Sequence, residues 1–294
     1  MGRRCAYLTM DDFGDFVSDA DLSFEPMAEL GWSAEMVPWR DPDIDWDDFD
    51  LVYICTPWDY QNDVAAFLGV LERIESSSAV LVNSVDLVHW NLEKNYLRDL
   101  ESRGAGIVPS LFHDVFDEGD IAGWFAAHDK DKIVVKPLVG ANSDHIVVLT
   151  QPVPDAVLDE LHQTYAARPF FVQPFVDSVQ SEGEYSTFFF NGDYSHAILK
   201  KPREGDFRSQ EEFGADILGV DAPQALIDTA HDVVALVEPL PVYVRADFVR
   251  DGADRFLLME LELIEPSLYL RTDPGSAARF ASAINERFEV LTGK

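Results

Sequence analysis

The 294-residue sequence predicts an α/β fold, with an α+β arrangement in the C-terminal half. In the first third, short apolar runs alternate with segments of helical spacing, which is typical of a mostly parallel sheet covered by helices. Further along, Asn191-Gly192 and Asp251-Gly252 each separate two apolar runs and indicate antiparallel hairpins. Hydrophobic residues make up 47% of the chain, so we expect a sizeable core divided over two or three lobes.

A first lobe of the parallel α/β type is expected over residues 1–108. Its strands are expected at 5–9, 34–37, 51–55 and 80–82, and its helices at 22–30, 64–74 and 92–100. Ligands of such sheets bind beyond the carboxyl ends of the strands, where residues 56–60 and 83–86 lie. The sequence contains no Gly-rich dinucleotide fingerprint and no P-loop, which disfavours nicotinamide-dependent and Walker-type enzymes.

Two further lobes are expected, at 109–178 and 179–294, after a boundary at 104–110. The second lobe should contain a helix at 121–128, a strand at 132–137, a turn at 140–143, a strand at 146–149, a helix at 155–165 and a strand at 170–175. The third should contain a hairpin of strands 185–190 and 194–199, a polar loop at 201–219, a helix at 222–237, a second hairpin within 241–270 and a helix at 275–288.

The second hairpin places charged residues on one face of a strand pair. If Arg250 pairs with Arg255, Arg245 lies opposite Glu260 and Asp247 lies opposite Leu258. Because side chains alternate between faces, one face then carries Arg245, Asp247, Leu258, Glu260 and Glu262. The other face is apolar and carries Ala246, Phe248, Met259, Leu261 and Leu263.

Three carboxylates on one strand face need a counter-charge. Two unit charges about 4 Å apart repel by roughly 4 kcal/mol at an effective dielectric of 20. A cation between the carboxylates removes this cost, and oxygen ligands suit Mg²⁺ or Mn²⁺. The alternative is a solvated strand face whose charge Arg245 offsets in part.

The charge of the chain restricts its partners. The formal net charge is −32, which repels nucleic acid and anionic membranes and argues against both. Strong acidity is also typical of adaptation to high salt, or reflects solubility alone. Only 22 residues are Lys or Arg, and eight of them fall in the segments discussed here, which suggests a buried anionic ligand: Lys94, Lys136, Lys200, Lys201, Arg203, Arg208, Arg245 and Arg271.

Several features indicate a cytoplasmic protein. No apolar run reaches transmembrane length, and the first residues lack the long apolar region of a signal peptide. The two cysteines, Cys5 and Cys55, lie on separate expected strands and have no metal-ligand spacing. A disulfide framework is therefore not expected.

Residues in and near the second lobe allow two interpretations each. Lys136 ends a buried strand before a Gly-containing turn and is either a surface terminator or a phosphate ligand. Lys94 lies on an expected helix, where exposure to solvent is the ordinary state. The segment 173–177 either presents free backbone groups to a flat base edge or is a simple crossover.

Taken in order, these features resemble the ATP-grasp superfamily over about residues 85–290. The order comprises a helix lysine, a strand lysine before a Gly-bearing turn, a Gln-Pro-Phe-Val hinge, a Glu-bearing hairpin, an Arg-x-Asp strand and a Glu-x-Glu strand. The set is similar to the branch that contains glutathione synthetase and the RimK-like ligases. Within it, the segments KPREGDFRSQEEFG at 201–214 and MELELIEPSLYL at 259–270 resemble cycloserine synthetase and its relatives.

The resemblance implies a role for each matching residue. It implies contact with ATP phosphates for Lys94 and Lys136, and with adenine or the nearby ribose and hinge for Gln173, Phe175, Val176 and Glu184. It implies metal binding, to Mg²⁺ or Mn²⁺, by Asp247, Glu260 and Glu262. It makes Arg245 and Arg208 candidate catalytic residues, and Arg203 and Arg271 candidate substrate ligands.

Two positions depart from the family pattern. Many relatives have Asn where this chain has Glu262, so the ligation at that position differs in charge. Asn142-Ser143 stands where many relatives have a more Gly-rich loop over the phosphates.

The implied activity is an ATP-dependent ligase acting on a small amino-acid-like substrate. Phosphoryl transfer to a substrate oxygen gives an acyl phosphate and ADP, and a nitrogen nucleophile then displaces phosphate to form an amide-type bond. The bond forms either within one molecule, as in cycloserine synthetase, or between two, as in glutathione synthetase and RimK. A nucleotide-binding regulator without turnover is the alternative from another class. Relatives often dimerise, so a homodimer is one expectation.

Overall fold

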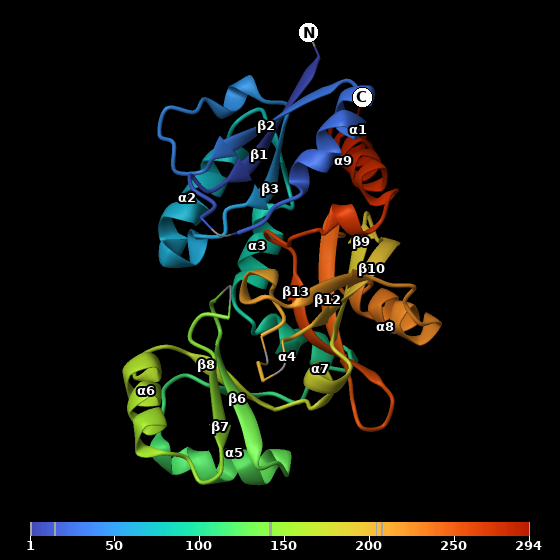
Figure 1. Ribbon diagram of the computed structural model, residues 1–294. Coiled ribbons are helices and arrows are strands. Elements are labelled where there is room, and N and C mark those ends of the chain that lie inside the picture. Colours follow the sequence, from blue (N-terminus) through green and yellow to red (C-terminus); the bar gives the residue numbers. More distant parts are fainter. Residues whose placement is uncertain (1, 15, 141–142, 204, 207, 294) are drawn as a thin grey trace.

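Three β-sheets follow one another along the long axis of the molecule (Figure 1). The computed structural model describes residues 2–14, 16–140, 143–203, 205–206 and 208–293. The first sheet contains β1 to β4, the second β5 to β8 and the third β9 to β13. The third sheet lies between the other two, and both ends of the chain lie beside the first sheet (Figure 1).

The first sheet is parallel, in the order β2-β1-β3-β4, as the alternating pattern predicts. Its strands are β1 (Arg3–Thr9), β2 (Trp32–Pro38), β3 (Leu51–Thr56) and β4 (Val80–Val82). One face packs on α2 (Val64–Glu75), which buries Phe67 and Leu71 against the sheet. The other face packs on α1 (Phe24–Glu29) and on the last helix, α9 (Ser276–Thr292). The C-terminal helix therefore completes the core of the N-terminal sheet.

The prediction of a single helix at 92–100 is wrong. Two helices occupy this region, α3 (Val85–Leu92) and α4 (Tyr96–Ser102). Ser84 caps α3 by accepting a hydrogen bond from the Leu87 N–H, and Glu93 adopts an extended conformation that ends the helix. The Lys94 N–H then donates to the Leu138 carbonyl at 2.9 Å instead of continuing a helix. Lys94 therefore lies in a break between helices, next to the second sheet.

The second sheet is antiparallel, in the order β5-β8-β6-β7. Its strands are β5 (Leu111–His113), β6 (Lys132–Pro137), β7 (Val147–Thr150) and β8 (Phe170–Pro174), and its helices are α5 (Ile121–His128) and α6 (Asp155–Tyr165). All were expected except the three-residue strand β5. Of the turn expected at 140–143, Ala141 and Asn142 lie outside the described residues.

The third sheet is antiparallel, in the order β11-β10-β9-β12-β13. Its strands are β9 (Glu184–Phe190), β10 (Asp193–Lys201), β11 (Asp216–Gly219), β12 (Tyr243–Arg250) and β13 (Phe256–Glu262). It packs on α8 (Gln224–Val234), and the short helix α7 (Ser178–Ser181) joins it to the second sheet. Both expected hairpins are confirmed, whereas the region expected as a polar loop contains β11.

The predicted register of the second hairpin is wrong by two residues. Arg245 lies opposite Glu262, and Asp247 lies opposite Glu260. The first residue of the shift arises at the turn. Arg250 pairs with Phe256 instead of Arg255, and the Asp251 N–H bonds to the Arg255 carbonyl at 2.8 Å. A bulge at Met259 adds the second residue of the shift, because Phe248 pairs with Leu258 whereas Asp247 pairs with Glu260.

The bulge also changes which apolar residues share a face. Leu258 packs in the apolar cluster with Ala246 and Phe248, and Met259 lines the opposite side with Glu260. A shift of two residues keeps the side-chain alternation, so Glu260 and Glu262 remain on the face expected for them.

Buried polar side chains join the first sheet to the edge of the third. The Tyr243 hydroxyl donates to the Ile264 carbonyl at 2.9 Å and lies 3.3 Å from the carbonyls of Ile54 and Val82. The Asn83 side chain bonds to the backbone of Val242, Tyr243 and Leu263. Asn91 and Tyr96 bond in the same way to the free backbone groups of β13, at Leu261 and Leu263. The backbone groups at this edge of the third sheet therefore have hydrogen-bond partners on side chains of the first lobe.

A buried histidine lies on β10. His196 stacks on Phe188 with ring centroids 4.3 Å apart, and its Nε2 lies 3.0 Å from the Leu268 carbonyl. Burial lowers the pKa of His196 to about 4, so the ring is neutral at physiological pH.

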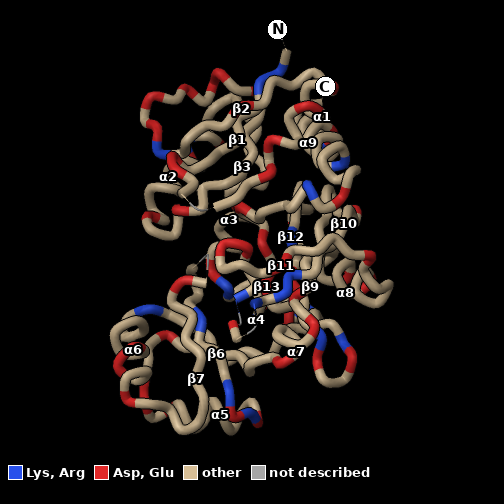
Figure 2. Tube along the Cα trace, in the orientation of Figure 1, with Lys and Arg blue, Asp and Glu red and all other residues tan. Residues whose placement is uncertain are grey.

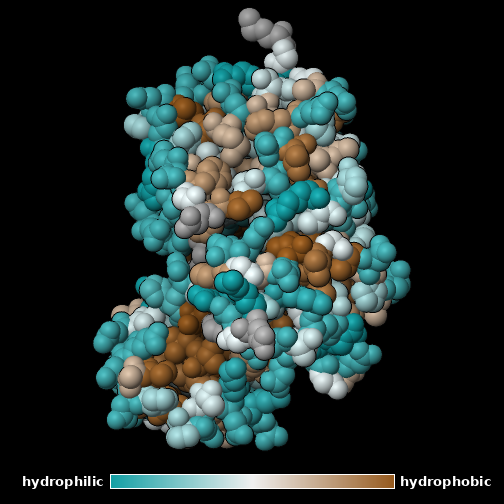
Figure 3. Space-filling model, viewed as in Figure 1, coloured by the Kyte–Doolittle hydropathy of each residue, from teal (hydrophilic) through white to brown (hydrophobic). Residues whose placement is uncertain are grey.

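Charge and hydropathy are distributed unevenly over the molecule. Acidic residues are spread over the outer loops and helices, whereas basic residues gather where the second sheet faces the third (Figure 2). Hydrophilic side chains cover most of the visible face, and hydrophobic areas lie over the lobe of the second sheet and over the third sheet (Figure 3). Within the described ranges, no helix has the length and apolar character needed to cross a membrane.

Candidate active site

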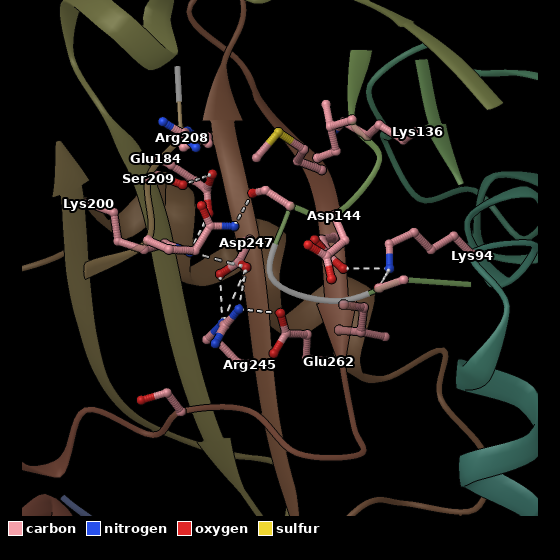
Figure 4. Close-up of a pocket in the computed structure, with 18 of the residues that line it drawn as sticks. Lys94, Lys136, Asp144, Glu184, Lys200, Arg208, Ser209, Arg245, Asp247 and Glu262 are labelled. Carbon is pink, nitrogen blue, oxygen red and sulfur yellow. Dashed lines mark hydrogen bonds and ion pairs between the residues drawn. The ribbon is translucent and has the colours of Figure 1, made fainter. Parts of the chain in front are cut away.

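A cavity lies between the second and third sheets and extends to loops of the first sheet (Figure 4). Every residue expected to bind nucleotide or metal lines it: Lys94, Lys136, Gln173, Phe175, Val176, Glu184, Asp247, Glu260 and Glu262. The two candidate catalytic arginines, Arg208 and Arg245, line it as well. The first and last of these residues lie more than a hundred residues apart in the sequence, and the fold brings all of them together around one cavity.

The three expected metal ligands form one cluster. Asp247 on β12 and Glu260 and Glu262 on β13 each offer a carboxylate oxygen, and these oxygens lie within 4.8 Å of one another. Asp247 is fully buried, whereas Glu260 and Glu262 are partly exposed toward the cavity. Three oxygen donors at this spacing fit a hard divalent cation such as Mg²⁺.

Basic residues already compensate each member of the cluster. The Arg245 guanidinium pairs with Asp247 at 3.1 Å and with Glu262, and Lys94 pairs with Glu260 at 2.9 Å. Burial alone would raise the pKa values of Asp247 and Glu260. The combined effect of Arg245, Lys200 and hydrogen bonds on Asp247, and of Lys94 and Lys136 on Glu260, lowers both values. Both carboxyl groups are therefore ionised at neutral pH and available as ligands.

Glu262 behaves differently from its two neighbours. Burial raises its pKa to about 7, and the negative charges of Glu260 and Asp247 add to the effect of burial against the attraction of Arg245. A divalent ion bound between the three carboxylates would remove that repulsion and favour the ionised form of Glu262. The extra carboxylate at this position therefore fits a metal site.

Lys136, at the end of β6, faces the cavity without a counter-charge. Within the described chain no carboxylate lies within ion-pair distance of its ammonium group, and burial lowers its pKa. Lys94 lies nearby and also donates to the Gly140 carbonyl at 2.9 Å. Two ammonium groups beside an acidic cluster suit a polyanion such as a triphosphate.

The hinge between the second and third sheets forms an apolar slot. Gln173 is buried and donates to the Ser110 hydroxyl at 3.0 Å, and Phe175 is buried under the Lys132 ammonium group. Val176 packs with Val108 in the same region. The Phe175 N–H is already bonded to the Lys132 carbonyl at 3.0 Å, so it is not available to a base edge.

Residues 208–212 line one side of the cavity. Arg208 pairs with Asp206 at 2.7 Å and stacks on Phe213, which holds its guanidinium at the cavity wall. Ser209 donates to the Glu184 carboxylate at 2.8 Å. The two candidate substrate ligands lie elsewhere. Arg203 is exposed beside Gly214.

Arg271 connects three segments instead of lining the cavity. Its guanidinium pairs with Asp19 at 3.3 Å and with Glu211 at 2.5 Å. Asp19 belongs to the loop after β1, and Glu211 belongs to the segment 205–214. In this arrangement Arg271 holds that segment over the cavity.

The sequence reasoning did not identify Lys200 as a site residue. Lys200 is buried on β10, and its ammonium group pairs with Glu184 and lies 3.3 Å from Asp247. Lys200 lies opposite Glu184 across the first hairpin, so a cross-strand charge pair was the available signal. Counting residue pairs outward from the turn of the first hairpin places Lys200 one residue away from Glu184. The observed pairing differs because a bulge follows Tyr194.

Tyr60 and Glu265 were also not assigned roles, although both line the cavity. Trp58, expected near the substrate pocket, lines it, whereas the neighbouring Asp59 turns away and pairs with Arg40 at 2.9 Å. Trp39 and Trp46 pack in the core.

Comparison with known proteins identifies the family. Residues 5–83 match the N-terminal domain of D-cycloserine synthetase DcsG, and residues 117–239 match the ATP-grasp domain of prokaryotic glutathione synthetase. The cycloserine biosynthesis protein DcsG of Streptomyces lavendulae is 32% identical over 289 residues, which cover 92% of this chain and 95% of that protein. The chain belongs to the ATP-grasp ligases. The ligase interpretation is therefore favoured over that of a regulator without turnover.

Solved structures agree with this assignment. The crystal structure of D-cycloserine synthetase DcsG superposes on the ligase with a TM-score of 0.85 at 29% identity and covers 97% of this chain and 99% of its own. The ATP-grasp ligase PsnB, solved with a minimal precursor, Mg and ADP, shares the fold with a TM-score of 0.65 at 14% identity and covers 97% of each chain. The protein is thus an ATP-dependent, ADP-forming ligase of the amide-bond-forming kind, in a family that uses ATP and magnesium.

Proposed function

We propose that this ligase closes a ring within one small amino-acid-like molecule, as the name of D-cycloserine synthetase implies for that enzyme. The observation that carries the proposal is the match of residues 5–83 to the N-terminal domain of that synthetase. This lobe supplies Trp58 and Tyr60 to the end of the cavity beyond the metal carboxylates. The match therefore includes a wall of the substrate pocket as well as the ATP-binding part.

The proposed roles follow from charge and position in the cavity. Lys94 and Lys136 bind the phosphates of ATP, and the slot formed by Gln173, Phe175 and Val176 holds the adenine, with Glu184 close to the ribose. Asp247, Glu260 and Glu262 hold magnesium, for which manganese is a chemically similar replacement. When bound, the ion offsets negative charge on the phosphate oxygens.

In the proposed reaction, a carboxylate oxygen of the substrate attacks the γ-phosphorus of ATP, and the bond from that phosphorus to ADP breaks. An amine-type nitrogen then attacks the acyl carbon and loses a proton, and inorganic phosphate leaves. Arg245 and Arg208 face the cavity and stabilise the charge that moves to the phosphoryl oxygens. The protein needs no nucleophilic side chain, and the thiols of Cys5 and Cys55 are buried away from the cavity.

ADP release from magnesium-ATP tests the proposal. The panel comprises single amino acids, ureido and aminooxy amino acids, and pairs of amino acids, at low and high salt because the chain is strongly acidic. ADP release with one molecule, together with a product mass that shows ring closure, supports the proposal. Release that requires a second amine overturns ring closure in favour of intermolecular ligation.

Intermolecular ligation is the second candidate function. It is favoured by the match of residues 117–239 to the ATP-grasp domain of glutathione synthetase. In that case the same acyl phosphate forms, and the amine belongs to a separate molecule. The paired amino acids of the panel distinguish the two candidates.

We further propose a cytoplasmic homodimer built of three lobes, at 1–108, 109–178 and 179–294. The three sheets fall within these ranges, which supports the boundaries. Limited proteolysis tests the boundaries, and sedimentation at low and high salt tests the oligomeric state.

A further inference from the structure

One acidic residue of the cavity has no part in the roles described so far. Glu265 lies three residues after Glu262, at the end of the cavity formed with the first sheet. The Trp58 indole N–H donates to the Glu265 backbone carbonyl at 2.9 Å and fixes this part of the chain. The Tyr60 hydroxyl lies close enough to the Glu265 carboxyl group to lower its pKa, so it is placed to orient this side chain.

Glu265 differs from the other buried or partly buried carboxyl groups of the cavity in lacking a cation. Glu184, Asp247, Glu260 and Glu262 each pair with a lysine or arginine, and Glu211 pairs with Arg271. Among the described carboxyl groups that line the cavity and are at least partly buried, Glu265 alone has no ion-pair partner.

This missing partner carries an electrostatic cost. Burial, together with the negative charge of Glu262, raises the pKa of Glu265 to about 8, against the individually smaller opposing effects of Lys94, Tyr60 and Arg245. A buried carboxylate is stable when a cation is placed against it. Because the group faces the cavity, a ligand is able to supply that cation.

The walls around Glu265 restrict what the ligand is. Phe16, Trp58 and Tyr60 place aromatic rings at this end, and Ser267 adds a hydroxyl group. Arg245 and Glu262 line the same cavity and lie close enough to Glu265 to affect its pKa. An anionic site and a cationic site thus lie next to each other, which matches the ammonium and carboxylate groups that an α-amino acid carries on one carbon atom.

We propose that Glu265, oriented by Tyr60, binds the protonated amino group of the substrate. The inference rests on the proposed function, because it assigns the substrate carboxylate to the phosphate side of the same cavity. Glu265 thereby selects amino acids over the corresponding hydroxy or deamino acids. It also holds the carboxylate toward Arg245 and the γ-phosphate.

The test compares two ligands that differ in one amino group. Calorimetry in the presence of magnesium-ADP measures the binding of D-cycloserine and of the same isoxazolidinone ring without its amino group. The wild-type protein should prefer D-cycloserine by roughly tenfold or more, as expected for a hydrogen bond to a charged group. Glu265→Gln, which keeps the shape and removes the charge, should abolish this preference while leaving ATP affinity unchanged.

Two further variants separate binding from a structural role. Glu265→Asp keeps the charge and should retain a preference for the amine at reduced affinity. Glu286→Gln removes an equivalent charge from the exposed face of α9 and should change neither ligand's affinity. The proposal is overturned if the wild-type protein binds both compounds equally or binds neither, or if Glu265→Gln keeps the preference.

The panel assay for ADP release keeps this proposal separate from the proposed function. ADP release combined with equal binding of the two ring compounds overturns the amine site alone. No ADP release, combined with a preference that Glu265→Gln abolishes, overturns ring closure and leaves the amine site standing.

Discussion

Replacing Lys200 by methionine should destabilise the protein strongly. The Lys200 ammonium group is the only cation paired with Glu184 in the described chain, and it lies 3.3 Å from Asp247. At an effective dielectric of 20, the attraction to Asp247 alone is about 5 kcal/mol before the cost of burying the lysine. Removing one partner of such a buried pair leaves an uncompensated charge, so we expect a loss of about 3–5 kcal/mol.

Urea unfolding followed by far-UV circular dichroism measures this loss. The double variant Lys200→Met/Glu184→Gln should recover part of it because it removes the Glu184 charge that would otherwise have no cation, giving a coupling energy of at least about 1 kcal/mol. Lys201→Met, the exposed neighbour, is the matched control and should change stability by less than about 0.5 kcal/mol. A Lys200→Met variant within about 1 kcal/mol of the wild type would refute the reasoning, since the pair would then contribute no more than a surface ion pair.

Three further predictions concern the site and the core. Asp247→Asn and Glu260→Gln should each abolish magnesium-dependent ADP release with an unchanged circular dichroism spectrum; full activity in both would make the acidic face a solvated surface. Lys136→Ala should weaken ATP binding in calorimetry by roughly tenfold, through loss of one charged contact, and equal affinity would contradict a phosphate role. Between its ordinary pKa of 6.5 and about 4, His196 binds a proton only in the unfolded chain, so stability should fall by up to about 3 kcal/mol as pH is lowered through this range. The pH dependence of urea unfolding checks this, and His196→Asn should lack that part of the loss; identical profiles would be the contrary result.

Most of the fold follows from local patterns. Helices α5 and α6 and strand β6 begin and end where apolar spacing and turn residues place them. The parallel order of the first sheet follows from the alternation of strands and helices. The three-residue strand β5 and the short β11 carry too few residues for a periodic signal, and each forms because a longer neighbouring strand pairs with it.

The register of the second hairpin depends on contacts that no local pattern contains. The Leu258 N–H bonds to the Gly106 carbonyl, and the Val108 N–H bonds to the Leu258 carbonyl, both at 2.9 Å. A segment some 150 residues earlier in the chain therefore pairs with β13 at the point where the bulge begins. The bulge at Met259 is a tertiary feature, which explains why alternation alone put Leu258 and Met259 on the wrong faces.

The residues that line the cavity were easier to predict than the ion pairs that they form. Each nucleotide and metal candidate lines the cavity, and for the charged residues on β6, β9, β12 and β13 the reason is that a charge inside an apolar strand has few other places to lie. Which cation meets which carboxylate depends on distances across sheets. Lys200 and Arg271 show this, since one is paired inside the cavity and the other joins Asp19 to Glu211 outside it.

The hydrogen bonds from Asn83, Asn91 and Tyr243 determine how the protein can be recombined with its relatives. Asn83 and Asn91 of the first lobe donate to the backbone carbonyls of Leu263 and Leu261, and the Tyr243 hydroxyl of the third lobe accepts from the Asn83 N–H at 3.2 Å. A chimera that exchanges the first lobe alone would leave buried donors and acceptors of β13 unpaired unless the incoming lobe presents equivalent amides. The first and third lobes should therefore be exchanged together. A chimera designed to alter substrate choice should take both lobes from the same relative.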